Sequence, residues 1–245
     1  MLYLYCICRT RDLRPCPPPE PPDGPLGLRW VDAGDLNALA APAPAASDVA
    51  SLLAYGQVVA HYHAHLDLVP MRYGSRLEDA DAVRAHLRAD HDRYEALLET
   101  LSDCVELGVR LPLPADAGAG KQASAAGAGV AAAPRSGRDY LLARRARLEV
   151  TAAVEAVLEQ LDEALAGLYR RRHREQGWFA GERRLSAYYL VPRPSLPAFQ
   201  RRLAAALQTV AVPGGPQALL TSGPWPPYSF AAADDGSATQ EAVFT

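Results

Sequence analysis

The sequence has few of the residues that most often carry redox or metal chemistry. It contains four cysteines and two methionines among 245 residues. The cysteines have neither the C-x-x-C spacing of zinc ribbons nor the density of a disulfide framework. Cys6 and Cys8 alternate within an apolar run, so on a strand they would point to the same face. We therefore interpret Cys6, Cys8, Cys16 and Cys104 as free thiols, buried in a protein of a reducing compartment.

The chain also lacks a basic excess and a long apolar run. Its formal net charge is −3, which argues against a dedicated nucleic-acid binder. No segment approaches the ~18–20 continuous apolar residues needed to span a bilayer. The apolar stretch 1–9 has no leading basic region and no small-residue cleavage site, so we expect a first strand rather than a signal peptide. These features predict a cytoplasmic protein that neither spans a membrane nor binds nucleic acid.

Catalytic motifs are absent as well. Gly118-Ala119-Gly120-Lys121 does not have the spacing of a phosphate-binding loop, and the serine motif G-x-S-x-G does not occur. The carboxylate pairs Glu78-Asp79 and Asp162-Glu163 lie on the polar faces of predicted helices, where we expect them to be solvated. No nucleophile, base and orienting group come together, so we predict no enzyme, no cofactor and no small-molecule substrate.

Three histidines, His61, His63 and His65, offer the strongest candidate metal site. On a strand all three would share a face, whereas on a helix His61 and His65 share one face and His63 points nearly opposite. The context is helical, and the glutamate of the H-E-x-x-H motif is missing. Structural histidines are the preferred interpretation. The alternative is a metal-binding enzyme or sensor that uses these histidines with Cys104.

Periodicity and breakers predict an α+β chain of two domains. The first domain, 1–111, is expected to hold two helices and three strands, with an extended proline-rich loop at 14–25. The helices are predicted at 48–65 and 79–100, and the strands at 2–8, 28–31 and 104–111. Residues 112–136 are rich in alanine and glycine and predict a flexible linker.

The second domain is predicted over 137–232 and begins with a long helix from 137 to about 174. The basic run Arg170-Arg171-Arg172-His173-Arg174 would then complement the dipole at the helix end, or else contact an acidic partner. A strand, a helix and two short strands follow, an order compatible with a ferredoxin-like α+β unit. They are expected at 184–191, 195–207, 206–212 and 217–222. The tail 233–245 is expected to be disordered.

The segment from Leu220 to Phe230 is the most distinctive part of the chain. Its prolines make it stiff, because proline fixes φ and removes the backbone donor. Its aromatic rings either pack on the core of the second domain or dock a partner. Nothing in the sequence decides between these two interpretations.

Several segments together resemble the GvpL/GvpF family of gas vesicle proteins. Leu2-Tyr3-Leu4-Tyr5-Cys6-Ile7 resembles the family's opening strand, with Cys6 where glycine is frequent. Leu68-Val69-Pro70-Met71-Arg72-Tyr73-Gly74-Ser75 is similar to its aliphatic-Pro-x-Arg-Phe-Gly-Thr motif, with Tyr73 for phenylalanine and Ser75 for threonine. Further similar segments are Leu107 to Val109, Gly137 to Arg145, Ala187 to Val191 and, most specifically, Gly223 to Phe230.

The resemblance implies two α+β domains, the second a modified ferredoxin-like unit. It also implies a non-enzymatic accessory or structural protein of gas vesicle assembly, located at the vesicle or in the cytoplasm. The expected partners are the hydrophobic shell subunit and other accessory gas vesicle proteins, without a lipid membrane. An adaptor that never enters the vesicle is a further interpretation. The motif residues expected to bind partners are Pro70, Arg72, Tyr73, Gly74, Gly223, Pro224, Trp225, Pro226, Pro227, Tyr228 and Phe230.

Overall fold

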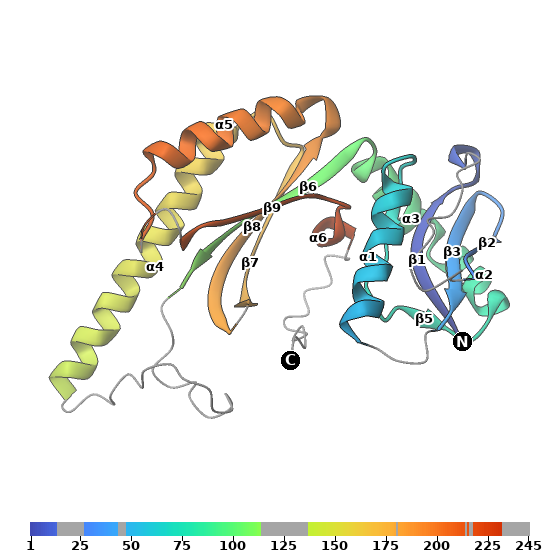
Figure 1. Ribbon diagram of the computed structural model, residues 1–245, viewed down its shortest axis with the longest axis horizontal. Helices are drawn as coiled ribbons and strands as arrows, with labels where there is room; N and C mark the ends of the chain where they lie inside the picture. Colours follow the sequence, from blue (N-terminus) through green and yellow to red (C-terminus); the bar gives the residue numbers. More distant parts are fainter. Residues whose placement is uncertain are drawn as a thin grey trace. The chain divides into compact units, whose positions relative to one another are not determined.

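The computed structural model describes residues 1–13, 27–43, 48–113, 137–179, 181–213, 215 and 218–231. These residues form two sheets and the helices that pack on them (Figure 1). The expected loop at 14–25, all but the first residues of the linker at 112–136, and the tail at 233–245 lie outside the described residues. None of the described helices is long and apolar enough to cross a membrane.

The first sheet is built around β1, Leu2–Arg9, in the strand order β2-β3-β1-β4 with β5 also paired to β1. All pairs of β1 with β3, β4 and β5 are antiparallel. The other strands are β2 (Arg29–Asp32), β3 (Leu36–Pro42), β4 (Val69–Pro70) and β5 (Arg76–Leu77). The strands predicted at 2–8 and 28–31 are confirmed. Strand β3 was not predicted, because its alanines give no β-branched signal.

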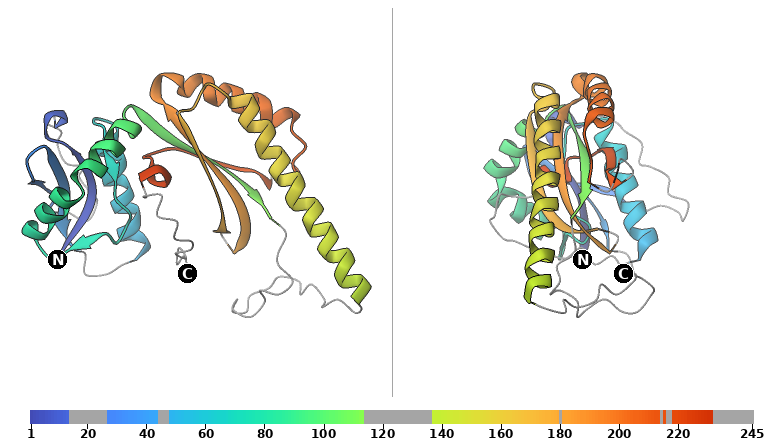
Figure 2. Two further views of the ribbon diagram at one scale, coloured as in Figure 1. Left: turned by 180° about the vertical axis from the view of Figure 1, so that it is seen from behind. Right: turned by 90° about the vertical axis from the view of Figure 1, so that its left-hand side faces the viewer.

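Helices cover both faces of the first sheet. Helix α1 (Val49–His63) packs on one side, and α2 (Ala80–Ala89) and α3 (His91–Leu101) pack on the other (Figures 1 and 2). Consecutive residues of β1 point to opposite faces of a sheet, yet seven of its eight residues are buried. The sheet is therefore a middle layer, and its strands are apolar on both sides.

Local signals explain where these helices begin and end. The side chain of Asp48 accepts a hydrogen bond from the Ser51 amide at 2.8 Å and caps α1, as the sequence predicted. The single helix predicted at 79–100 is instead two helices, because the backbone at Asp90 leaves the helical conformation. Asp90 ends α2, and its carbonyl accepts the first hydrogen bond of α3, from Tyr94.

The second sheet has the strand order β7-β8-β6-β9. Its strands are β6 (Cys104–Pro112), β7 (Arg171–Phe179), β8 (Glu182–Pro192) and β9 (Leu220–Trp225). With α4 (Gly137–Leu165) after β6 and α5 (Leu196–Thr209) after β8, the element order is β-α-β-β-α-β. This is the order of a ferredoxin-like unit. The strand at 104–111, which the sequence assigned to the first domain, is one of the two central strands of this sheet.

Helix α4 is shorter than the sequence predicted. It ends at Leu165 and is followed by Gly167 with a φ of +80°, the conformation in which glycine commonly terminates a helix. The basic run at 170–174 therefore does not lie at a helix end. It begins β7, and alternation along the strand places Arg172 and Arg174 on one face.

That face of β7 meets a buried carboxylate. Arg172 and Arg174 both donate to Asp162 of α4, and the Tyr189 hydroxyl donates to the same carboxylate at 2.7 Å. Asp162 is buried, so its predicted place on a solvated helix face is wrong. The neighbouring Glu163 is exposed, as predicted. Burial and the Asp162 carboxylate raise the pKa of Tyr189.

The chain divides into two compact units that differ from the predicted domains. The first unit contains Leu190–Arg193 and the described parts of Met1–Leu107 and Gly223–Gly236. The second contains the described parts of Gly108–Tyr189 and Pro194–Ser222. Each of β6, β8 and β9 thus begins in one unit and ends in the other. Residues 223–231, assigned by the sequence to the second domain, group with the first unit.

Candidate partner-binding segments

The turn that carries the motif 70–74 is held against β1. Pro70 pairs with Cys6 in the sheet, and the Met71 amide donates to the Tyr5 carbonyl at 2.9 Å. The turn closes with a hydrogen bond from the Ser75 amide to the Arg72 carbonyl. Gly74 has a φ of +91°, a conformation that side chains disfavour. The motif therefore encodes one fixed turn at the end of a strand pair.

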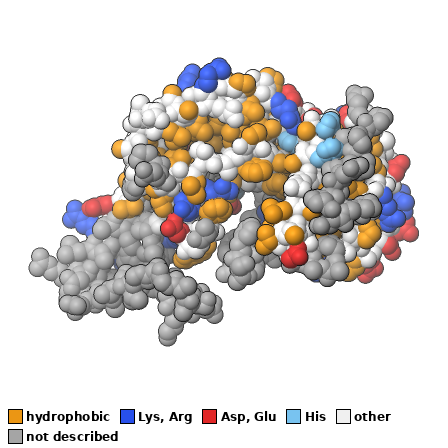
Figure 3. Space-filling model, viewed as in Figure 1, with side chains coloured by type: hydrophobic (Ala, Val, Ile, Leu, Met, Phe, Trp, Pro, Cys, Tyr) orange, Lys and Arg blue, Asp and Glu red, His pale blue; other side chains and the backbone are white. Residues whose placement is uncertain are grey.

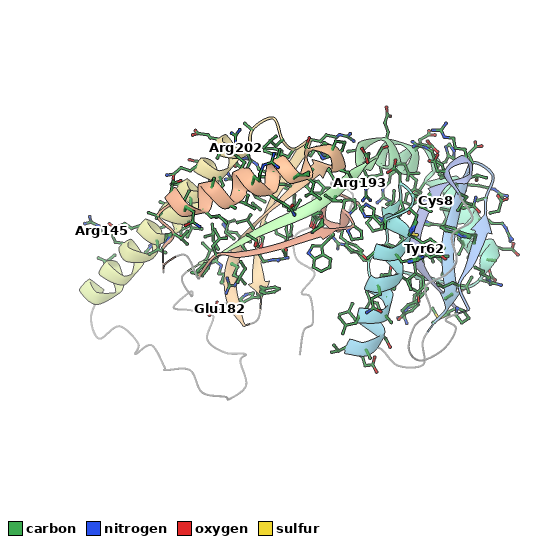
Figure 4. The ribbon with its side chains drawn as sticks, turned by 45° about the horizontal axis from the view of Figure 1, so that its top comes forward. Cys8, Tyr62, Arg145, Glu182, Arg193 and Arg202 are labelled. Carbon is green, nitrogen blue, oxygen red and sulfur yellow. The ribbon has the colours of Figure 1, made fainter. Side chains whose placement is uncertain are left out.

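Tyrosine rings pack beneath this turn. Tyr73 makes edge contacts with Tyr3 and Tyr55, with ring centroids 5.9 and 5.3 Å apart. Tyr55 also stacks on Tyr5 at 4.5 Å. A β-bulge between Leu4 and Cys6 keeps Tyr3, Tyr5, Cys6 and Cys8 in one hydrophobic cluster with α1. The labelled Tyr62 and Cys8 lie in this region in Figure 4.

The polar side chains in and beside this cluster differ in the hydrogen bonds that they make. The Tyr55 hydroxyl donates to the carbonyl oxygens of Leu4 and Met71, 2.7 and 2.8 Å away, and burial raises the pKa of Tyr55. The Tyr73 hydroxyl is buried without a hydrogen-bond partner among the described residues. The side chain of Arg72 is exposed, and in the described part of the chain it has no hydrogen bond or ion pair.

The closing segment has a buried half and an exposed half. Pro226 and Pro227 are buried, and Phe230 is 5% exposed. Trp225 is 52% exposed, and Gly223 and Pro224 are exposed as well. The side chains of Pro226, Pro227 and Phe230 therefore pack, whereas the side chain of Trp225 is exposed.

The buried half packs on the first unit rather than on the core of the second. Residues Tyr228–Ala231 form the short helix α6, which contacts β4 and α3. Tyr228 packs against the cluster that contains Tyr55, and burial raises the pKa of Tyr228. Because α6 contacts β4, the motifs at 68–75 and 223–230 meet within one unit.

Glu106 fixes this segment and was missed by the sequence analysis. The carboxylate is 5% exposed and accepts hydrogen bonds from the amide and hydroxyl of Ser229, at 2.7 and 2.9 Å. A carboxylate that bonds the first amides of a helix acts as a cap. Nothing near Glu106 in the sequence signals this role, because its partner is 123 positions away.

Gly223 allows the closing segment to approach β6. Its φ is +107°, and a Cβ added there would lie 2.5 Å from the Glu106 carbonyl oxygen. Only glycine fits a conformation and a backbone contact of this kind. The peptide bond from Gly223 to Pro224 is cis. The positive φ and the close contact at Gly223 set the path of the chain that leads to Pro226 and Pro227.

The candidate histidine site does not assemble. His63 is buried, and its Nε2 lies 3.0 Å from the Cys104 carbonyl oxygen, while Arg193 donates to the His63 carbonyl at 2.5 Å. Burial and the Arg193 charge lower the pKa of His63 to about 4. His61 and His65 lie on another face, and histidine side chains are seen at the surface over the end of α1 (Figure 3). Among the described residues no group of three ligands could hold a metal.

The cysteines behave as the sequence predicted where the structure describes them. Cys6, Cys8 and Cys104 are free and buried. Burial raises the pKa of Cys6 well above its usual value and that of Cys8 to about 12. Both therefore remain as unreactive thiols at neutral pH. Cys16 lies outside the described residues.

Comparison with known proteins gives a family and a fold. The family described as gas vesicle synthesis protein GvpL/GvpF matches residues 1–232. A protein named gas vesicle protein L from Streptomyces sp. (strain CB03234) is 32% identical over 186 residues, which cover 71% of this chain and 66% of that protein.

Two solved structures resemble the fold along nearly the whole chain. GvpF from Anabaena sp. PCC7120 has a TM-score of 0.70 at 16% identity, covering 94% of this chain and 95% of its own. GvpF from Microcystis aeruginosa has a TM-score of 0.69 at 15% identity, covering 94% and 98%. At these identities the likeness concerns the fold alone.

Proposed function

The chain belongs to the GvpL/GvpF family of gas vesicle synthesis proteins, and from this membership we propose that it is a non-enzymatic accessory protein of gas vesicle assembly. It acts in the cytoplasm or at the vesicle, where it binds the hydrophobic shell subunit and other gas vesicle proteins. The family match over residues 1–232 carries the proposal. We propose neither a cofactor nor a small-molecule substrate for this protein.

The proposed mechanism is to cover apolar surface during wall growth. A shell subunit with a large exposed apolar surface aggregates unless a partner shields it. Trp225 offers a large exposed ring on a backbone that Glu106 and the adjacent prolines hold in place. A preorganised aromatic ring loses little entropy when it binds. Arg72 and Gly74, exposed on the turn whose strand contacts α6, are the further contact residues we propose.

Replacing Trp225 by alanine tests this contact. The variant is expected to unfold at the wild-type temperature, because an exposed side chain adds little to stability. It should lose most co-purification with the shell subunit when both are produced together. Trp178 is the matched control, because it is also exposed, at 62%, but lies on β7. Trp178→Ala should retain the shell subunit at the wild-type level.

A deletion of the gene tests the function as a whole. A gas vesicle producer that lacks this protein should make few or no vesicles, and the wild-type gene should restore them. Normal vesicles in the deletion strain would refute the assembly role. Equal retention of the shell subunit by Trp225→Ala and wild type would refute only the role of Trp225.

A further inference from the structure

The two faces of the second sheet are covered differently. On one face, Tyr189 meets both helices: it donates to Asp162 of α4, and its ring lies 5.5 Å from that of Phe199 in α5. Adjacent residues of a strand point to opposite faces, so Tyr188 belongs to the face without these helices. Figure 3 shows hydrophobic side chains gathered over the strands of this sheet.

Arg110 lies on this second face between two aromatic rings. Its guanidinium carbon is 4.9 Å from the centre of the Phe179 ring and 5.5 Å from that of Tyr188. One nitrogen donates to the Ser222 hydroxyl at 2.9 Å. The rings attract the cation and also remove water from it. The guanidinium group is therefore half-buried and held in one place.

Among the described arginines, Arg110 is unusual because it combines this packing with the lack of a carboxylate partner. Arg9 and Arg184, for comparison, bind Glu95 and Glu182 at 2.7 and 2.6 Å. A guanidinium has five N–H donors, and the contacts of Arg110 in the described part of the chain use one nitrogen, through Ser222. The remaining donors can bind an acceptor that the described residues do not supply.

The nearby carboxylate of Glu175 is already engaged. It accepts the Tyr188 hydroxyl at 2.7 Å, and a nitrogen of His173 lies 3.9 Å from it. The His173 ring also stacks on Tyr188 at 6.3 Å with an interplanar angle of 19°. These contacts fix the Tyr188 ring against which Arg110 rests, and the guanidinium of Arg110 has no ion pair with any residue that the structure describes.

Gly108 shows that the arrangement is closely fitted. A Cβ added at Gly108 would lie 2.8 Å from the Ser222 hydroxyl oxygen and 3.4 Å from the Tyr188 ring. The ring and the hydroxyl thus occupy the space that a side chain would take. Strands β6, β7, β8 and β9 each contribute a residue, so the position of Arg110 is set by the whole sheet.

We propose that Arg110, with Phe179 and Tyr188, is a binding site for a carboxylate side chain on a partner protein, and that the partner segment carries an apolar residue beside that carboxylate. The free edge of a guanidinium binds a carboxylate through two parallel hydrogen bonds. Phe179 and Leu220, 42% and 38% exposed, provide apolar contact.

The inference rests on the proposed function to the extent that the partner is another gas vesicle protein. The site favours an acidic, partly apolar segment over nucleic acid, because a single guanidinium set among apolar rings suits one carboxylate and not a row of phosphates. The Arg110 site and the Trp225 segment follow each other along the chain, because Leu220 and Ser222 lie on β9, the strand that ends at Trp225.

Peptide binding to the full chain tests the site. The probes are acetyl-Leu-Glu-Leu-Glu-Leu-amide and the same peptide with glutamine in place of glutamate, each labelled for fluorescence anisotropy. Wild type is expected to bind the glutamate peptide about tenfold more tightly than the glutamine peptide. Arg110→Ala should bind the glutamate peptide about tenfold more weakly than wild type does. Its affinity for the glutamine peptide should be almost unchanged.

Two further variants keep the test independent of folding. Arg110→Lys retains the charge but not the planar fork, so it should bind between wild type and alanine. Arg145→Ala removes an exposed arginine of α4 that pairs with Glu149, and it should bind like wild type (Figure 4). The proposal is overturned if wild type binds neither peptide, if both peptides bind equally, or if Arg110→Ala matches Arg145→Ala.

The deletion strain separates this inference from the proposed function. If vesicles are lost on deletion but peptide binding does not depend on Arg110, only the carboxylate site is wrong. If the deletion strain makes normal vesicles, the assembly role is wrong whatever the peptides do. Restoration of vesicles by Arg145→Ala and not by Arg110→Ala would support both.

Discussion

The two units solve the same packing problem in different ways. In the first, helices cover both faces of the sheet, and a segment from near the end of the described chain returns to complete the core. Its buried polar groups include tyrosine hydroxyls, the neutral ring of His63 and the carboxylate of Glu106, which accepts hydrogen bonds from Ser229. In the second, α4 and α5 share one sheet face, and a charged group, Asp162, is buried between them and the sheet.

The difference bears on where partners can bind. A sheet covered on both faces exposes only its edges and turns, so the exposed motif residues of the first unit are Arg72, Gly74, Gly223, Pro224 and Trp225. A sheet face without helices can present a surface made by several strands, as the Arg110 cluster does. The first unit therefore exposes single residues on its turns, and the second exposes a surface formed by several strands. The following variants test this contrast, beginning with the largest expected effect.

Replacing Phe230 by alanine should give the largest loss of stability. The side chain is almost fully buried, and removing a buried phenylalanine costs about 3–5 kcal/mol. Denaturant unfolding measures the loss, and Trp225→Ala is the exposed control, expected within about 0.5 kcal/mol of wild type. Hydrogen exchange should accelerate first in α3 and β4, which α6 contacts. If hydrogen exchange accelerated equally in α4, the two units would not open separately.

Replacing Asp162 by asparagine should weaken the second unit instead. The change leaves Arg172 and Arg174 without their shared carboxylate, and breaking a buried pair costs about 3–5 kcal/mol. Both arginines are partly exposed, so we expect about 2–3 kcal/mol after solvent screening. Glu163→Gln, the exposed neighbour, should change the unfolding free energy by less than about 0.5 kcal/mol. Equal effects of the two variants would contradict the buried network.

Local sequence signals predicted most of the individual elements. Strand β1, the capped start of α1, the strand at 104–111 and the helix near 195–207 all follow from periodicity, caps and prolines. The similar motifs also identified the family. These features depend on residues close together in the chain, where pattern and propensity carry the information.

The errors arise where distant residues decide the structure. Strand β7 was read as the end of a helix because arginines occupy both its faces and hide the period of two. Its inward arginines are stabilised by Asp162, about ten positions earlier in α4. The stop at Gly167 was present in the sequence and overlooked. Glu106 and Arg110 gave no signal, because Ser229 and Phe179, their partners, are remote in the sequence.

Lowering the pH should destabilise the first unit through His63. Its folded pKa of about 4 lies below the ordinary value of 6.5, so the unfolded chain takes up the proton first as the pH falls. The contribution of His63 to the free energy of unfolding is constant above pH 6.5. As the pH falls toward 4, this contribution is lost at about 1.4 kcal/mol per pH unit. The total reaches about 3 kcal/mol at pH 4.

The glutamine variant isolates this titration. His63→Gln can still donate to the Cys104 carbonyl but does not titrate, so its stability should fall less steeply between pH 6.5 and 4 than that of wild type. Urea unfolding at several pH values gives both slopes, and the carboxylates that also titrate there contribute equally to the two proteins. Identical slopes would mean that the region around Arg193 and Asp67 lets His63 ionise without cost.

Two tyrosines of the first unit give the smallest effects, of opposite sign. Tyr55→Phe removes a hydroxyl that donates to Leu4 and Met71 and should cost about 1–1.5 kcal/mol, because a carbonyl is left unsatisfied. Tyr73→Phe removes a buried hydroxyl that has no partner in the described chain, and it should stabilise the protein by about 1 kcal/mol. Thermal unfolding of both variants beside wild type checks the signs. A loss of stability in Tyr73→Phe would mean that the Tyr73 hydroxyl binds an acceptor in solution, and that the turn carrying Arg72 and Gly74 is held by more than ring packing.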